Sequence, residues 1–430
     1  MTTINKIKEL TKKSTYYEDL YDIIWLLNKG RGVLESDYKN IRIGLFNTPC
    51  GGFGDIIVCK TFYDYLVDWY PGAKVSICTT APKKYKELGI SGNIYKLTNK
   101  DNNEEECIDY NKLILKKKIK FDIMIVIPII NKTFDIKQFK KLIPYANVFN
   151  TFSVSEYNGE YPPYTFPIGV GEGNLGLLFN NFKIKQQRLI KKPYALVYIQ
   201  PSPQWGVHSK SCFLSYLEMI CKGYSKKHFK FQVVIPSWID EERENPLFLS
   251  KIRKVVSKYY DNIYFVNSDG KEAIVEDAES KSELTFRADI LPQQRDIFIS
   301  LMKDSIKDIL VTGDQSLSDI LSCCRGSKQV WYQIAPWKKG LAYNLSKYVP
   351  NKYYSTFKTS CGTLESMDSG INWKNIMRDY DFRINGKRRM DSIILGVNDL
   401  KRDKYLIKML DIIEHSRYLE TVQNKVNKLK

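Results

Sequence analysis

The sequence predicts an α/β protein with two Rossmann-like domains in succession. Two observations support this fold class. Apolar strand-like runs alternate with glycine-marked turns and amphipathic helical runs, and the pattern appears in both halves of the chain. The chain has 430 residues, about three times the ~150 residues of a typical domain. We therefore expect an N-terminal helical extension at 1–40, an N-terminal domain at 41–190, a C-terminal domain at 191–345, and a C-terminal extension with a closing helix at 346–430.

The N-terminal domain begins with a strand, a tight turn, a helix and a second strand. This order within a short stretch is a βαβ unit, which implies parallel strands joined by a right-handed crossover. The later run 121–128 is almost continuously apolar, as is typical of a parallel strand covered on both faces. The expected elements are strands at 41–47, 74–79, 121–128 and 146–152, and a helix at 56–70.

A proline- and glycine-rich connection at 153–193 precedes the C-terminal domain, where the same alternation returns. Apolar residues recur at helical spacing after Asp399, so the tail is expected to be helical. The expected strands are 194–200, 231–236, 262–266, 309–312 and 329–332, and the expected helices are 212–223, 293–305 and 316–324.

The charge balance favours an anionic partner. The chain carries 66 Lys and Arg against 48 Asp and Glu, a net charge of +18. A phosphorylated small molecule, a membrane surface or a nucleic acid would suit this excess. The basic residues are spread thinly and form no arginine-rich stripe, so we expect no nucleic-acid partner. The longest apolar run, Ile123–Ile130, is far shorter than the ~20 residues of a membrane-spanning helix. Peripheral membrane contact stays open.

Cysteine and histidine usage bears on metals and on location. Nine cysteines occur without a CxxC pair, and the chain has three histidines. Zinc-finger spacing is therefore absent, and no metal site is expected. The odd number of cysteines favours reduced thiols. Because the first twenty residues also lack the apolar core of a secretory signal, we expect a cytoplasmic protein.

The first candidate site is the loop after the first strand. Gly52, Phe53 and Gly54 are expected to line a ligand cleft, since glycine lets the backbone approach a ligand closely. Asp55, which follows them, has two interpretations. It is either a general base at the rim of the cleft or the N-cap of the helix that follows. The loop lacks the GxGxxG pattern, which disfavours a nicotinamide cofactor.

The first strand, the GGFGD turn, the helix and the segment YPGAKVSI resemble the opening of the lipopolysaccharide heptosyltransferase (ADP-heptose) family, which has the GT-B glycosyltransferase fold. In that family an aspartate after the first strand is the catalytic base, and Asp55 matches it. The segment YIQPS followed by Lys210 is similar to the family's strand, small-residue turn and donor-facing lysine. The segment ILVTGDQSLS stands in place of its D-T-G-x-x-H donor loop, without the histidine. The resemblance implies two domains facing across a cleft.

Two loops of the C-terminal domain are candidates for binding the donor. In the first, Ser202 and Lys210 supply a hydroxyl and a cation beside the N-terminus of a predicted helix. Together these groups suit a diphosphate. The alternative interpretation is an ordinary solvated loop between a strand and a helix.

The second donor loop follows the strand at 309–312. Gly313 permits a close backbone approach, and Gln315 and Ser316 stand at a helix N-terminus whose N–H groups favour an anion. Ser316 is also a capping candidate. Asp314 either accepts hydrogen bonds from sugar hydroxyls or helps to cap the helix.

Together these features predict a glycosyltransferase. The C-terminal domain would bind a nucleotide-sugar donor, and Asp55 would deprotonate the acceptor hydroxyl. We expect metal-independent catalysis and no cofactor beyond the nucleotide-sugar co-substrate, because no DxD-like motif stands in a suitable loop. The acceptor, whether carbohydrate, lipid-linked or protein, stays open. The alternatives are a nucleotide-sugar epimerase or hydrolase on the same scaffold, and a non-catalytic nucleotide- or nucleic-acid-binding protein.

Overall fold

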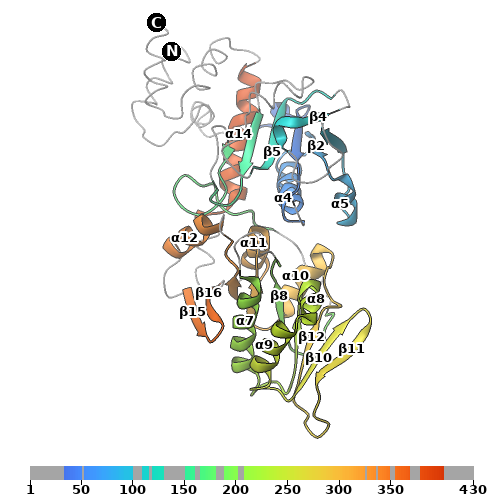
Figure 1. Ribbon diagram of the computed structural model, residues 1–430. Helices are drawn as coiled ribbons and strands as arrows, with labels where there is room; N and C mark the ends of the chain where they lie inside the picture. Colours follow the sequence, from blue (N-terminus) through green and yellow to red (C-terminus); the bar gives the residue numbers. More distant parts are fainter. Residues whose placement is uncertain are drawn as a thin grey trace. The chain divides into compact units, whose positions relative to one another are not determined.

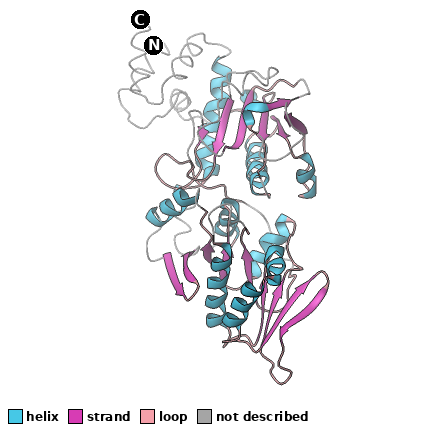
Figure 2. Ribbon diagram, in the orientation of Figure 1, coloured by secondary structure: helices cyan, strands magenta, loops and turns pink. Residues whose placement is uncertain are grey.

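The computed structural model divides the chain into two units (Figure 1). Unit 1 comprises Met1–Leu178 and Tyr380–Lys430, and unit 2 comprises Phe179–Asp379. Each unit contains a mainly parallel sheet with helices beside it, so the predicted Rossmann-like fold class is confirmed (Figure 2). That the two domains face each other across a cleft stays a prediction. The structure describes residues 33–50, 53–99, 109–115, 119–129, 151–159, 165–180, 188–201, 208–324, 327–335, 338–348, 354–368 and 378–400.

The described strands of unit 1 form a sheet in the order β4-β3-β2-β1-β5-β6-β7. Neighbouring strands are parallel apart from β3 and β4, which are antiparallel. The central strand β1 is buried at every residue after Arg42, which explains its continuous apolar character. The strands are β1 (Arg42–Asn47), β2 (Lys74–Thr79), β3 (Ile94–Asn99), β4 (Leu113–Leu115), β5 (Ile123–Ile129), β6 (Thr151–Ser155) and β7 (Thr165–Phe166).

Helices from the N-terminal part and from the C-terminal part of the chain pack against this sheet. Helix α4 (Gly54–Trp69) connects β1 to β2 and buries residues at helical spacing, Phe62 and Leu66 among them. Helix α14 (Phe382–Leu400) returns to unit 1, and its Phe382 ring lies 6.2 Å from that of Tyr65 in α4. The closing helix therefore completes the core of the first unit. The other described helices here are α3 (Glu35–Tyr38), α5 (Pro82–Glu87) and the short 3₁₀ helix η1 (Tyr110–Lys112).

The described strands of unit 2 form a sheet in the order β11-β10-β12-β9-β8-β13-β14-β16-β15. The central strands from β10 to β14 are parallel, and antiparallel strands lie at both edges. Figure 1 shows β10 and β11 extending as a hairpin at one edge. The strands are β8 (Tyr194–Tyr198), β9 (Lys230–Val234), β10 (Asn262–Asn267), β11 (Gly270–Val275), β12 (Glu283–Arg287), β13 (Asp308–Val311), β14 (Gln329–Tyr332), β15 (Tyr354–Thr359) and β16 (Gly362–Asp368).

The helices of unit 2 pack on an apolar core. Phe213 and Leu217 of α7 (Ser209–Tyr224) lie in this core. Val233 of β9 and Ile252 of α9 (Pro246–Val256) lie there too, and all four side chains are fully buried. No helix among the described residues is long and apolar enough to cross a membrane. The helices are α7 (Ser209–Tyr224), α8 (Ser237–Glu241), η3 (Glu242–Glu244), α9 (Pro246–Val256), α10 (Arg295–Asp304), α11 (Asp314–Cys323) and α12 (Lys339–Tyr348).

The structure differs from the sequence-based expectations at several element ends. Helix α11 begins at Asp314 rather than at 316, and α14 begins at Phe382 rather than at 399. The antiparallel edge strands of unit 2 were not predicted. The division between the units falls after Leu178, earlier than the expected 190, and the chain after Asp379 belongs to unit 1. Residues 1–32 and 401–430 lie outside the described part, so the N-terminal extension and most of the tail stay predictions.

A glycine is required close to the boundary between the units. Backbone hydrogen bonds join Leu177 N–H to the Tyr380 carbonyl, and Phe382 N–H to the Leu177 carbonyl, so the outgoing and returning chains run side by side. Gly176 adopts a φ of 107°, and a Cβ there would overlap the Tyr380 carbonyl. Only glycine combines this backbone conformation with so close an approach.

Candidate functional site

Both sheets reverse their strand order next to their first strand. In unit 1, β2 lies on one side of β1 and β5 on the other. In unit 2, β9 lies on one side of β8 and β13 on the other. Open α/β sheets bind ligands beyond the carboxyl ends of their strands at such switch points. The loops after β1, β8 and β13 are therefore the candidate site in each unit, and they are the loops that the sequence singled out.

In unit 1, Asp55 closes the loop after β1. It is the second residue of α4, and its half-buried carboxylate accepts a 2.9 Å hydrogen bond from the Cys50 N–H through Oδ2. The N-cap of α4 is Phe53, which makes no side-chain capping bond. The interpretation of Asp55 as an N-cap is therefore wrong, because the helix begins at Gly54 and the carboxylate turns back onto the loop instead.

The structure describes two of the three other residues that were predicted for this loop. Phe53 is half-buried, and the Lys84 ammonium of α5 lies 5.9 Å from its ring centroid. Gly54 is exposed. Gly52 lies outside the described residues, so its role stays a prediction.

A buried polar network anchors the loop at the switch point. Asn47, at the end of β1, donates to the Ile127 carbonyl of β5 at 2.8 Å and accepts from the Tyr85 hydroxyl at 2.8 Å. Tyr110 donates to the Pro128 carbonyl at 3.1 Å and accepts from the Thr48 N–H at 3.1 Å. Sequence analysis missed this network, although an asparagine that ends an otherwise apolar strand is a recognisable signal.

The groups below the loop resist losing protons. Burial raises the pKa of Tyr85 and of Tyr110, and the Asp55 charge adds to both shifts. Burial likewise raises the pKa of Cys59 to about 12. These three groups therefore stay protonated near neutral pH and cannot accept a proton there.

In unit 2, one buried glutamine joins the ends of three parallel strands. Gln333, which follows β14, accepts from the Gln200 N–H at 3.1 Å and donates to the Ser209 hydroxyl at 3.0 Å. The backbone carbonyl of Gln333 accepts from Thr312 Oγ1 at 3.3 Å. The start of α7 and the loops after β8 and β13 are thus held together. Gln333 was not singled out from the sequence.

Lys210 is the second residue of α7, which begins at Ser209 rather than at the predicted 212, and it has a carboxylate partner. Its ammonium lies 2.5 Å from Glu242 and 5.5 Å from the Phe248 ring centroid. The side chains of the ion pair are 41% and 37% exposed, so a ligand can reach them from solvent. Ser202 lies outside the described residues.

The loop after β13 forms the start of α11. Gly313 is the N-cap with a φ of 84°, so this helix end has no capping side chain. Asp314 follows and is buried. Its oxygens accept from Tyr332 Oη at 3.0 Å and from Lys338 Nζ at 2.5 Å. The capping interpretations of Asp314 and Ser316 are therefore wrong, because the helix starts two residues earlier than predicted.

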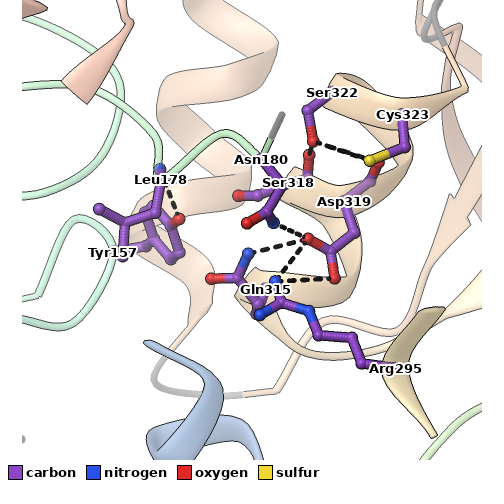
Figure 3. Close-up of polar contacts among 9 residues, drawn as sticks. All are labelled: Tyr157, Leu178, Asn180, Arg295, Gln315, Ser318, Asp319, Ser322 and Cys323. Atoms are coloured by element: carbon purple, nitrogen blue, oxygen red, sulfur yellow. Dashed lines mark hydrogen bonds and ion pairs between the residues drawn. The ribbon is translucent and has the colours of Figure 1, made fainter. Parts of the chain in front are cut away.

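A hydrogen-bond cluster around Asp319 positions the first turn of α11 (Figure 3). The Asp319 carboxylate is 4% exposed and accepts from Gln315 Nε2 and from Arg295 Nη2, each at 3.0 Å. Asn180 donates to the same carboxylate from the segment that begins unit 2. The predicted donor residue Gln315 is therefore held by a carboxylate that groups from two other segments also bind. Asp319, Arg295 and Asn180 were missed because nothing in the sequence indicates this long-range contact.

Within the described ranges, no group of three or more His, Cys, Asp or Glu side chains is placed to hold a metal ion. Cys50 is disulfide-bonded, so the expectation that all nine cysteines are reduced is wrong at this position. The other described cysteines are free: Cys59, Cys78, Cys212, Cys221, Cys323, Cys324 and Cys361.

No protein-family model matches the chain. No curated protein matches it either. Among solved structures it is similar to a glycosyl transferase family 9 protein from Veillonella parvula, at 10% identity and a TM-score of 0.33, covering 70% of this chain and 82% of that one. It is also similar to a putative UDP-N-acetylglucosamine 2-epimerase from Listeria monocytogenes, at 11% identity and a TM-score of 0.36, covering 83% and 91%. A UDP-forming trehalose-phosphate synthase from Burkholderia xenovorans has 9% identity and a TM-score of 0.26, covering 85% and 78%. Likenesses this distant carry no argument about function.

Proposed function

We propose that this protein is a glycosyltransferase that moves a sugar from a nucleotide-sugar donor to an acceptor hydroxyl. One observation carries the proposal. Each unit places its candidate loop at a topological switch point, with a carboxylate in unit 1 and two helix N-termini in unit 2. A carboxylate suits an acceptor hydroxyl, and helix N-termini suit a diphosphate.

In the proposed reaction, the Asp55 carboxylate takes the proton of the acceptor hydroxyl. The acceptor oxygen attacks the anomeric carbon of the donor sugar, and the bond from that carbon to the diphosphate oxygen breaks. The bonding electrons leave with the nucleoside diphosphate. The hydrogen bond from the Cys50 N–H holds one carboxylate oxygen of Asp55, which fixes the orientation of the base.

The leaving diphosphate would be stabilised by unit 2. The N-termini of α7 and α11 follow the adjacent parallel strands β8 and β13, so both positive helix ends lie at the same edge of the sheet. Lys210 adds a cation on a solvent-accessible side chain, which can exchange Glu242 for a phosphate oxygen. These positive groups would take the place of a divalent cation, so metal independence is part of the proposal.

A screen of nucleotide sugars tests the proposal. Full-length protein is heated with UDP-, GDP-, ADP-, CMP- or dTDP-sugars, and a ligand at 100 times its Kd adds about 2.7 kcal/mol of stability. The sugars that bind are then incubated with candidate acceptors, and both the released nucleotide and the new glycoside are measured.

We expect nucleotide release to depend on an acceptor. Release of free sugar, or formation of an epimer, without any acceptor would instead support a hydrolase or an epimerase on this scaffold. Failure of every nucleotide sugar to stabilise the protein, together with strongly salt-dependent nucleic-acid binding, would support a binding protein.

A further inference from the structure

A buried ion pair lies where the proposed function puts a diphosphate. Asp314 is the first residue of α11, and Lys338 immediately precedes α12. Lys338 Nζ lies 2.5 Å from Asp314 Oδ2, and the two side chains are 12% and 8% exposed. Tyr332, the last residue of β14, donates to the other carboxylate oxygen at 3.0 Å. Two segments outside α11 thus hold this carboxylate at the helix N-terminus.

A carboxylate at this position has two opposing effects. It stabilises α11, because the N-terminus of a helix carries a partial positive charge. It also repels a second anion brought to the same helix end, and like charges placed together weaken binding strongly. Lys338 cancels the Asp314 charge at contact distance. Since the pair is almost buried, salt screens it only weakly.

We propose that Lys338 determines the preference of this site for anionic ligands. By neutralising Asp314, it leaves the N-terminus of α11 able to attract a diphosphate. This inference rests on the proposed function and assigns a role to a residue outside the loops singled out from the sequence. Asp314, whose two oxygens accept hydrogen bonds within the protein, holds Lys338 and Tyr332 in place.

Calorimetric titration of the full-length protein with UDP, ADP, GDP, CDP and dTDP tests the inference. Lys338→Met leaves the Asp314 charge uncompensated, and its affinity for the diphosphate that binds best should fall about tenfold or more. Asp314→Asn keeps the lysine and should bind at least as tightly as the wild type. The neutral pair Asp314→Asn/Lys338→Met should bind within about threefold of the wild type, because the two charges are removed together.

A control variant tests whether any lost ion pair would have the same effect. Lys387 pairs with Asp391 at 2.9 Å in unit 1, so Lys387→Met removes an ion pair outside unit 2. Its diphosphate affinity should equal that of the wild type. Circular dichroism and melting temperature are recorded for every variant. If Lys338→Met unfolds, the single Asp314→Asn variant and the neutral pair decide the question.

The outcomes separate the two proposals. Wild-type protein that binds no nucleoside diphosphate overturns the proposed function, and this inference with it. Wild-type protein that binds a diphosphate, with a folded Lys338→Met variant of equal affinity, overturns the inference alone. Tenfold weaker binding by Asp314→Asn, or by the neutral pair, would overturn it as well.

Discussion

The contribution of Lys328 to the stability of this protein should rise with pH between about 8 and 10. Its side chain is 2% exposed, and its ammonium donates to the Ser305 and Ile306 carbonyls at the end of α10. Burial lowers the pKa of Lys328 to about 8, and the nearby Cys324, Asp304 and Asp308 offset only part of this effect. The charged form is therefore harder to accommodate in the folded state than in the unfolded chain.

The sign and size of the effect follow from proton linkage. The ordinary lysine pKa of 10.5 falls to about 8 on folding, which is worth roughly 3 kcal/mol of free energy of unfolding, an order-of-magnitude figure. Between these two values the unfolded chain binds more protons than the folded one, so stability increases with pH. Below pH 8 both states carry the proton, and the destabilisation is fully present. From about pH 9 the buried thiols oppose the trend, since burial raises the pKa of Cys59 and of Cys212 from 9.0 to about 12. Above about pH 10 the buried tyrosines oppose it as well, since burial raises the pKa of Tyr70 and Tyr216.

Urea unfolding at pH 7, 8, 9 and 10 measures this dependence for the wild type and for Lys328→Met. The variant keeps the length of the side chain but cannot titrate. We expect the wild type to gain about 1–3 kcal/mol relative to the variant between pH 7 and 10. Free energies of unfolding that change in parallel for the two proteins would refute the reasoning.

Three further predictions concern Gly176 in unit 1, the donor site and metals. Gly176→Ala should lower the free energy of unfolding by about 2 kcal/mol or more, because the alanine would have to keep a positive φ and avoid the Tyr380 carbonyl; an unchanged urea midpoint would contradict this. Lys210→Ala should weaken donor binding by roughly 1.5–3 kcal/mol, as expected for a lost charge-assisted hydrogen bond, and calorimetry showing equal affinity would remove Lys210 from the site. Turnover should persist in excess EDTA; its loss, with recovery on adding Mn²⁺ or Mg²⁺, would show that a metal site exists.

The parallel cores of both units could be predicted from the sequence because they follow local rules. Strand β2 has the predicted bounds, and α4 starts and ends within two residues of its prediction. Continuous apolar runs and a Gly-rich turn are sufficient for such elements. The edge strands β15 and β16 could not be predicted in this way, because they depend on pairing with β14 rather than on any pattern of their own.

The candidate site was predictable to the level of loops but not of contacts. A parallel sheet places its ligand loops at the carboxyl ends of strands, so the loops that contain Asp55 and Gly313 could be singled out from the predicted strands. The partners of these loops come from distant parts of the chain. Gln333 lies 133 residues from Gln200, and Lys338 lies 24 residues from Asp314. No local pattern marks such pairs, and so the ion pair at α11 emerged only from the structure.

The central claim is that Asp55 is the base of a sugar transfer, and Asp55→Asn tests it most directly. Asparagine keeps the side-chain shape and a carbonyl oxygen that can accept the Cys50 N–H bond, but it cannot take a proton. General-base catalysis contributes 10²–10⁴-fold, so turnover should fall by about that factor. Donor affinity and melting temperature should stay within error of the wild type. Asp64→Asn is the matched control, because Asp64 is an exposed carboxylate on the same helix, paired with Lys60.

The decisive measurement is the single-turnover rate of sugar transfer at saturating donor for the wild type, Asp55→Asn and Asp64→Asn. The account predicts a fall of about 10²-fold or more for Asp55→Asn and an unchanged rate for Asp64→Asn. An Asp55→Asn protein that folds, binds donor and transfers sugar at a rate near that of the wild type would contradict it.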